Sequence, residues 1–170
     1  MLLLAHGYMN HIVRFVSYYE ACLHYVKFPI KCILPIYFVF HGTPGVKHDN
    51  LYVAKHNGKI VSSVILSHEP EPAYYNTKWG FESDYTDVFV IHTFAIHPEF
   101  LKCGVGKALM DFSIKYSIKL RFKSIRLDVY EKNIPAIRLY EKCGFKYIDT
   151  VDLGLGNYGL NWFKLYEKLI

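Results

Sequence analysis

Hydrophobic and polar positions along the chain follow recognisable periods, and the longest apolar run is the clearest. Val88–Ile96 is almost continuously apolar, which is typical of a strand covered on both faces. Pro98 cannot donate to a strand ladder and therefore ends this run. Beyond it, apolar residues recur every three or four positions and predict an amphipathic helix. Its apolar face contains Val105, Ala108, Leu109, Phe112, Tyr116 and Leu120.

Shorter segments with strand-like patterns lie on both sides of this run. They are Ile36–Phe40, Leu51–His56, Lys59–Leu66, Ser124–Tyr130, Phe145–Leu153 and Gly159–Lys168. Asn57-Gly58 separates two of them and is a strong signal for a hairpin. A second helix is predicted over Ile134–Lys142, because Asn133 can cap it and Gly144 can close it.

The N-terminal part has a less regular pattern. His11–Lys27 has apolar residues at helical spacing and predicts a helix, and residues 41–50 predict a loop. Charged residues interrupt its apolar stretch, so we expect no membrane-spanning segment. It also lacks the basic start and small-residue cleavage site of a signal peptide. With 170 residues, the chain is expected to form a single domain, residues 1–170. Its core would be residues 51–170, preceded by an atypical part, residues 1–50.

Charge is distributed unevenly along the chain. The net charge is +5, and residues 101–126 alone contain seven basic residues and one acid. Nucleic-acid binding would predict a broader basic surface, so we expect no nucleic-acid partner. A small polyanion fits a confined basic patch better. The opposite sign dominates the segment Glu69–Asp87, whose five acids could either belong to an ordinary loop or attract a cationic ligand.

Cysteine and histidine spacing gives no indication of a metal site. The four cysteines form no C-x-x-C pair, and the nine histidines form no H-E-x-x-H motif. We therefore expect reduced thiols, a cytoplasmic location and no metal ion.

A glycine-containing loop connects the long strand to the first helix. Gly104-Val105-Gly106 lies where backbone N–H groups and the positive end of a helix dipole would meet, an arrangement that binds phosphate. A P-loop is excluded, because Leu101 and Ala108 occupy positions where it needs glycine and a hydroxyl. A dinucleotide fingerprint is weakened but stays open: Leu109 replaces its third glycine, whereas Asp128 lies near the position of a ribose-binding acid.

Two motifs together resemble the GNAT superfamily of acyl-CoA-dependent N-acyltransferases. Residues 101–106 are similar to its pyrophosphate loop Q/R-x-x-G-x-G/A except at Leu101. Residues 133–145 are similar to its second motif, N-x-x-A-x-x-[LF]-Y-x-x-x-G-F, at every defined position. The resemblance covers about residues 51–170. It implies a mixed α/β (α+β) fold, in which a mostly antiparallel sheet splays open at the central strand and is flanked by helices.

The resemblance also implies a cosubstrate, acetyl-CoA, and residues that would hold it. Its pantetheine arm would pair with the backbone of Phe94, Ala95 and Ile96, and Asn133 would contact the coenzyme. The pyrophosphate would bind N–H groups of Lys102, Cys103, Gly104, Val105, Gly106 and Lys107.

Acetyl transfer to an amine requires a base for the amine, polarisation of the thioester and an acid for the leaving thiolate. Tyr140 matches the family position of that acid, and the backbone N–H of Phe94 is the expected oxyanion donor. His92 is a candidate base; Glu82, Asp84 or Asp87 acting through water are alternatives.

These observations predict an N-acetyltransferase that uses a primary amine as acceptor. The acidic segment favours a small cationic amine. The resemblance also implies a homodimer, as relatives often form one. Two alternatives stay open: a catalytically idle acyl-CoA-binding module and, with less support, a nucleotide-binding oxidoreductase.

Overall fold

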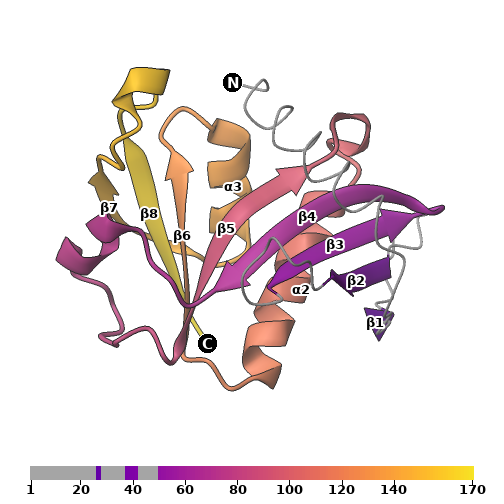
Figure 1. Cartoon of the computed structure of the whole chain (residues 1–170), viewed down its shortest axis with the longest axis horizontal. Helices are drawn as coiled ribbons and strands as arrows, with labels where there is room; N and C mark the ends of the chain where they lie inside the picture. Colours follow the sequence, from indigo (N-terminus) through magenta and orange to yellow (C-terminus); the bar gives the residue numbers. More distant parts are fainter. Residues whose placement is uncertain (1–25, 28–36, 42–49) are drawn as a thin grey trace. The chain divides into compact units, whose positions relative to one another are not determined.

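The computed structural model describes residues 26–27, 37–41 and 50–170, as strands and helices joined by turns (Figure 1). The chain divides into two compact units, which are described in turn. The first unit contains residues 1–65 and 93–109, and the second contains residues 66–92 and 110–170. The long strand β5 (Val88–Ile96) and the helix α2 (Val105–Lys119) each contribute residues to both units.

The first unit is built on antiparallel strands. These are β1 (Val26–Lys27), β2 (Tyr37–His41), β3 (Leu51–His56) and the first part of β4 (Lys59–Ser67), each paired with the next. Asn57 and Gly58 both have positive φ, 48° and 77°, as a two-residue hairpin turn of type I′ requires. The predicted hairpin is thereby confirmed.

The second unit has strand order β5-β6-β8-β7, with β6 at Ser124–Tyr130, β7 at Lys146–Val151 and β8 at Phe163–Leu169. β5 and β6 are parallel, whereas β8 is antiparallel to both β6 and β7. A dinucleotide-binding domain would need consecutive parallel strands, so this mostly antiparallel order argues against the oxidoreductase alternative.

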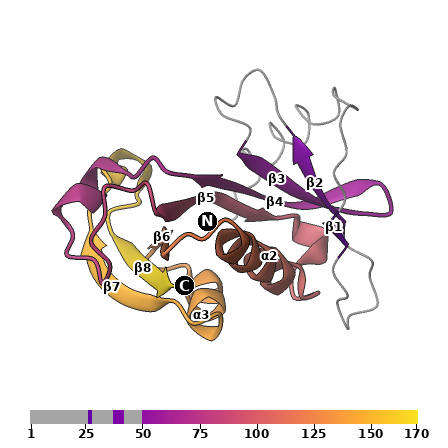
Figure 2. The ribbon, with the colours of Figure 1, turned by 90° about the horizontal axis from the view of Figure 1, so that it is seen from below.

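The two faces of this sheet are covered by different segments. On one face Phe89 of β5 stacks with Tyr116 of α2, and Tyr166 of β8 packs near Tyr140 of α3 (Ile134–Lys142). On the other face Val88, Val90 and Leu165 form a buried cluster with three aromatic residues that precede β5: Tyr74, Trp79 and Tyr85. In Figure 2 the segment with the 3-10 helix η1 (Pro72–Asn76) and the helix α3 lie on opposite sides of β6 and β8.

Several boundaries differ from the sequence predictions. Val26–Lys27 is a strand, so the predicted helix is wrong at these two residues, and the rest of that prediction falls outside the described part of the chain. Leu120 is 44% exposed because α2 ends at Lys119, so it is not part of the apolar face. β8 begins at Phe163 rather than Gly159, since η3 (Gly156–Tyr158) and a following turn occupy the preceding residues.

Among the described residues, none of the helices combines the length and the apolar character needed to cross a bilayer.

Candidate active site

The predicted site residues are divided between the two units. Phe94, Ala95, Ile96 and residues 102–107 belong to the first unit. His92, Asn133 and Tyr140 belong to the second. Each group is positioned by the local structure of its own unit.

The loop before α2 has the backbone conformation of a tight turn. After the short 3-10 helix η2 (Pro98–Phe100), Lys102 and Gly104 have positive φ, 63° and 82°. The N–H of Ala108 donates to the carbonyl oxygen of Gly104 at 3.0 Å and is the first hydrogen bond of the helical ladder. The N–H groups of Gly104, Val105 and Gly106 lie at the positive end of this 15-residue helix, whereas the N–H of Cys103 donates to the carbonyl oxygen of Phe100 at 3.4 Å. This local geometry is suited to an anionic group such as a pyrophosphate.

Residues 102–104 are exposed, whereas Val105 is buried at 1% exposure and anchors the start of α2. Lys102 and Lys107 are exposed beside this turn and add positive charge. Cys103 is an exposed free thiol whose Sγ lies 3.5 Å from the carbonyl oxygen of Leu101. The loop therefore offers backbone groups and cations to a ligand.

β5 contains a backbone irregularity next to the predicted base. Thr93 has a φ of 47°, which is unusual for a β-branched residue because its Cβ crowds the backbone. The regular alternation of β5 is interrupted there.

The ring nitrogens of His92 each lie near an oxygen atom of the segment that precedes β5. Its Nε2 lies 2.9 Å from the carbonyl oxygen of Glu69, and its Nδ1 lies 3.8 Å from Oε1 of Glu71. A carbonyl oxygen can only accept, so Nε2 carries a proton and Nδ1 is the basic nitrogen of the neutral ring. With 23% of its side chain exposed, His92 can exchange a proton with a ligand or with water. Sequence reasoning proposed His92 but missed Glu71.

A pair formed by buried Tyr74 and half-buried Asp128 extends this polar group. The hydroxyl of Tyr74 donates to Oδ1 of Asp128 at 2.8 Å. Burial, followed by the negative charge of Asp128, raises the pKa of Tyr74 well above its usual value. Burial also raises the pKa of Asp128, and the negative charge of Glu71 raises it further. The hydrogen bond from Tyr74 and the nearby His92 lower the pKa, but by less than burial raises it. Asp128 therefore belongs to one electrostatic group with His92 and Glu71, not to a ribose site.

Tyr140 lies on α3 with its side chain 5% exposed. Its ring centroid is 6.2 Å from that of Phe145 and 6.5 Å from that of Tyr166. Burial, and to a smaller extent the negative charge of Asp128, raises the pKa of Tyr140 above its usual value. Its hydroxyl therefore stays protonated at neutral pH, which is the state that a proton donor requires.

Asn133 precedes α3, and its carbonyl oxygen accepts the N–H of Ile137 at 3.1 Å. Its side chain forms no capping hydrogen bond, so the predicted capping role is wrong. The helix start depends instead on Pro135, whose fixed φ suits the first turn.

The alternative bases on the acidic segment are Glu82, Asp84 and Asp87, and all three side chains are exposed. Hydrogen bonds from the side chain and the backbone N–H of Thr86 lower the pKa of Asp84 and make it a weaker base.

One member of the predicted basic patch does not face solvent. Arg126 is 1% exposed and its Nε donates to Oε1 of Glu167 at 3.0 Å, which neutralises its charge. The alternation of β6 gave no sign of this partner 41 residues away. Across the described residues, no three His, Cys, Asp or Glu side chains gather as a ligand set for a metal ion.

Comparison with known proteins places these features in context. Residues 18–145 match a family model described as "Acetyltransferase (GNAT) family". The peptidyl-lysine N-acetyltransferase YiaC of Escherichia coli is 36% identical over 70 residues, which cover 41% of this chain and 44% of YiaC. The uncharacterized N-acetyltransferase MJ1207 of Methanocaldococcus jannaschii is 28% identical over 121 residues, 71% of this chain and 46% of that protein. The chain spans 30% to 46% of the length of the first curated relatives.

Solved structures share the fold. A Bacillus subtilis acetyltransferase in complex with CoA superposes with a TM-score of 0.55 at 17% identity, over 71% of this chain and 76% of that chain. The mixed α/β fold with a mostly antiparallel sheet and flanking helices, which the two motifs implied, is confirmed.

Proposed function

This chain belongs to the acetyltransferase (GNAT) family, and we propose that it transfers an acetyl group from acetyl-CoA to a primary amine. One observation carries the proposal. The loop that matches the pyrophosphate motif of the family forms a tight turn, with Gly104 at a φ of 82°, at the open end of α2. This is the local geometry that an anionic coenzyme needs.

The reaction requires an amine nucleophile without its extra proton. Nδ1 of His92 takes that proton directly or through water, and the imidazolium that forms can pair with the Glu71 carboxylate 3.8 Å away. The amine nitrogen then attacks the thioester carbonyl, and the backbone N–H of Phe94 stabilises the oxyanion.

Collapse of the tetrahedral intermediate breaks the carbon–sulfur bond and releases the thiolate of coenzyme A. A free thiol has a pKa of about 8.5, so protonation as the bond breaks lowers the barrier. Tyr140, which matches the family position of the acid, donates this proton from a hydroxyl that is protonated at neutral pH. In this proposal the backbone of residues 94–96 and residues 102–107 hold the coenzyme, with Asn133 as a further contact.

The acceptor is proposed to be a small cationic amine. Glu69, Glu82, Asp84 and Asp87 are exposed on the segment that precedes β5, and half-buried Glu71 faces His92. A segment of this charge raises the local concentration of cations. The proposed cellular setting is the cytoplasm and the proposed assembly is a homodimer, which light scattering on the purified chain would test.

The activity is tested by incubating the purified chain with acetyl-CoA and a panel of amines. Release of thiol together with a gain of one acetyl mass on one amine supports the proposal. Coenzyme A binding without transfer to any amine in a broad panel would instead support an idle acyl-CoA-binding module. A neutral or acidic acceptor that outcompetes every cationic amine would contradict the proposed acceptor class.

A further inference from the structure

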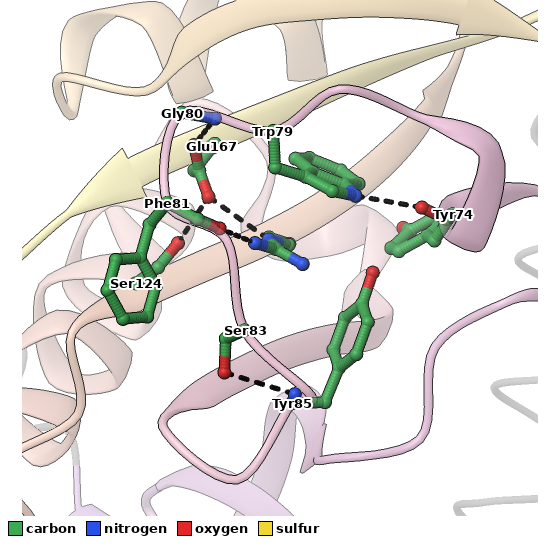
Figure 3. A network of polar contacts seen from close by, with 9 residues as sticks. Tyr74, Trp79, Gly80, Phe81, Ser83, Tyr85, Ser124 and Glu167 are labelled. Carbon is green, nitrogen blue, oxygen red and sulfur yellow. Dashed lines mark hydrogen bonds and ion pairs between the residues drawn. The ribbon is translucent and has the colours of Figure 1, made fainter.

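A buried ion pair lies in the second unit, beside the acidic segment that carries Glu71 (Figure 3). Arg126 on β6 and Glu167 on β8 are partners in the strand register and are 1% and 3% exposed. Burying two charges costs solvation energy, and apolar replacements of such pairs are often as stable or more stable. Stability alone is therefore a weak explanation for this pair.

Glu167 binds the sheet and the preceding segment at the same time. Its Oε1 accepts from Arg126 Nε and from Ser124 Oγ at 2.8 Å, and its Oε2 accepts the backbone N–H of Gly80 at 2.7 Å. A Cβ at residue 80 would lie 2.8 Å from Oε2, which is too close for a real contact. Glycine at this position thus lets the segment reach the carboxylate.

Arg126 contacts the same segment through Nη2 and the faces of its guanidinium group. Its Nη2 donates to the carbonyl oxygen of Phe81, and its guanidinium carbon lies 4.4 Å from the ring centroid of Trp79 and 4.7 Å from that of Tyr85. Only arginine combines a planar donor group with stacking on two aromatic faces. The pair therefore contacts residues 79, 80, 81 and 85 of one connection.

From this contact a chain of hydrogen bonds leads toward His92. Trp79 Nε1 donates to the carbonyl oxygen of Tyr74 at 2.9 Å, and the N–H of Tyr74 donates to the carbonyl oxygen of Glu71, also at 2.9 Å. The carboxylate of Glu71 is the group next to Nδ1 of His92. The tilted rings of Tyr74 and Trp79, 5.2 Å apart, stiffen the middle of this chain.

We propose that Arg126 and Glu167 form a positioning pair that fixes the segment of residues 71–85, so that Glu71 stays beside His92 while the acceptor amine binds. The inference rests on the proposed function for its catalytic consequence. Its structural part concerns the unliganded protein and does not depend on that function.

The test replaces both charges at once, in the double variant Arg126→Met with Glu167→Leu, so that no buried charge is left unpaired. We expect a folded protein with coenzyme A affinity within about twofold of the wild type. Amide exchange of residues 74–86 should be at least about tenfold faster, and the KM for the amine should rise by a similar factor. Lys78→Met is the matched control, because it removes an exposed cation from the same segment.

A second variant, Gly80→Ala, leaves both charges in place and puts a Cβ 2.8 Å from Oε2 of Glu167, so the segment or the carboxylate must shift and their contact is disturbed. It should give the same pattern of faster exchange and raised amine KM. If both variants keep wild-type amide exchange across residues 74–86, the positioning role is wrong. It is also wrong if exchange is faster but the amine KM is unchanged in an active enzyme. A wild type that binds coenzyme A and acetylates no amine would refute the proposed function, while the exchange data would still decide whether the pair fixes the segment.

Discussion

Tyr140 combines burial with a raised pKa, so its proton is retained throughout the neutral range. The hydroxyl is therefore in the protonated state that a donor to the leaving thiolate requires. The ring also packs against Phe145 and Tyr166, which holds the hydroxyl in one place.

Replacing Tyr140 with phenylalanine keeps the ring and removes the proton. We expect kcat to fall about 100-fold, the lower end of the range for general acid catalysis, while coenzyme A affinity is retained. Because Tyr140 does not titrate near neutral pH, the shape of the pH–rate profile between about pH 6 and 9 should be unchanged. Steady-state kinetics and calorimetry measure both. A Tyr140→Phe variant with wild-type kcat would rule out the acid role.

Asp128 predicts a dependence of stability on pH. The pKa of Asp128 is raised in the folded protein, chiefly by burial. At pH values above about 3.9, the ordinary pKa of an aspartate carboxyl, the folded state therefore binds more protons than the unfolded chain does. Stability from this residue is therefore lost as the pH rises through that window. Asp128→Asn does not titrate and can still accept the hydrogen bond from Tyr74.

The free energy of unfolding of Asp128→Asn, relative to the wild type, should increase from pH 4 to pH 7. Urea denaturation of the two proteins at matched pH values measures this difference, in which other titrating groups cancel. A relative stability that decreases over the same range would mean that the folded protein favours the Asp128 carboxylate.

At the scale of elements, two glycines share a left-handed backbone conformation and have different expected roles. Gly104, before α2, has a φ of 82°, and Gly58, in the β3–β4 turn, has a φ of 77°. Alanine at either position should cost roughly 1–2 kcal/mol of stability, because an L-residue is crowded in this conformation. Only Gly104→Ala should also weaken coenzyme A binding, by about tenfold or more.

Gly58→Ala is the matched control, since its new Cβ would meet open space. Denaturant midpoints and calorimetric titration of both variants separate backbone strain from ligand contact. Equal loss of coenzyme A affinity in both variants would show that this loop has no special role.

Elements with a local signal could be predicted, and those that depend on distant partners could not. The limits of β5 agreed with prediction because an apolar run and Pro98 mark them, and Asn57-Gly58 marked the hairpin. Asp128 was considered only as a ribose-binding acid, because Tyr74, its partner, is 54 residues away. The burial of Arg126 could not be predicted from the sequence either. Its partners, the carboxylate of Glu167 and the rings of Trp79 and Tyr85, come close to it only in the folded protein.

At the scale of the whole molecule, the loop of residues 102–107 belongs to the first compact unit, and His92, Glu71 and Tyr140 belong to the second. Coenzyme A binding is the step on which every later part of the account depends.

Titration of the purified chain with coenzyme A, followed by calorimetry and by the melting temperature, tests this step most directly. A ligand that binds only the folded state raises the melting temperature, so the account predicts saturable binding of one coenzyme A per chain with a rise that grows with ligand concentration. NADH should produce neither signal. A well-folded chain that binds no coenzyme A, or that binds NADH instead, would contradict the central claim.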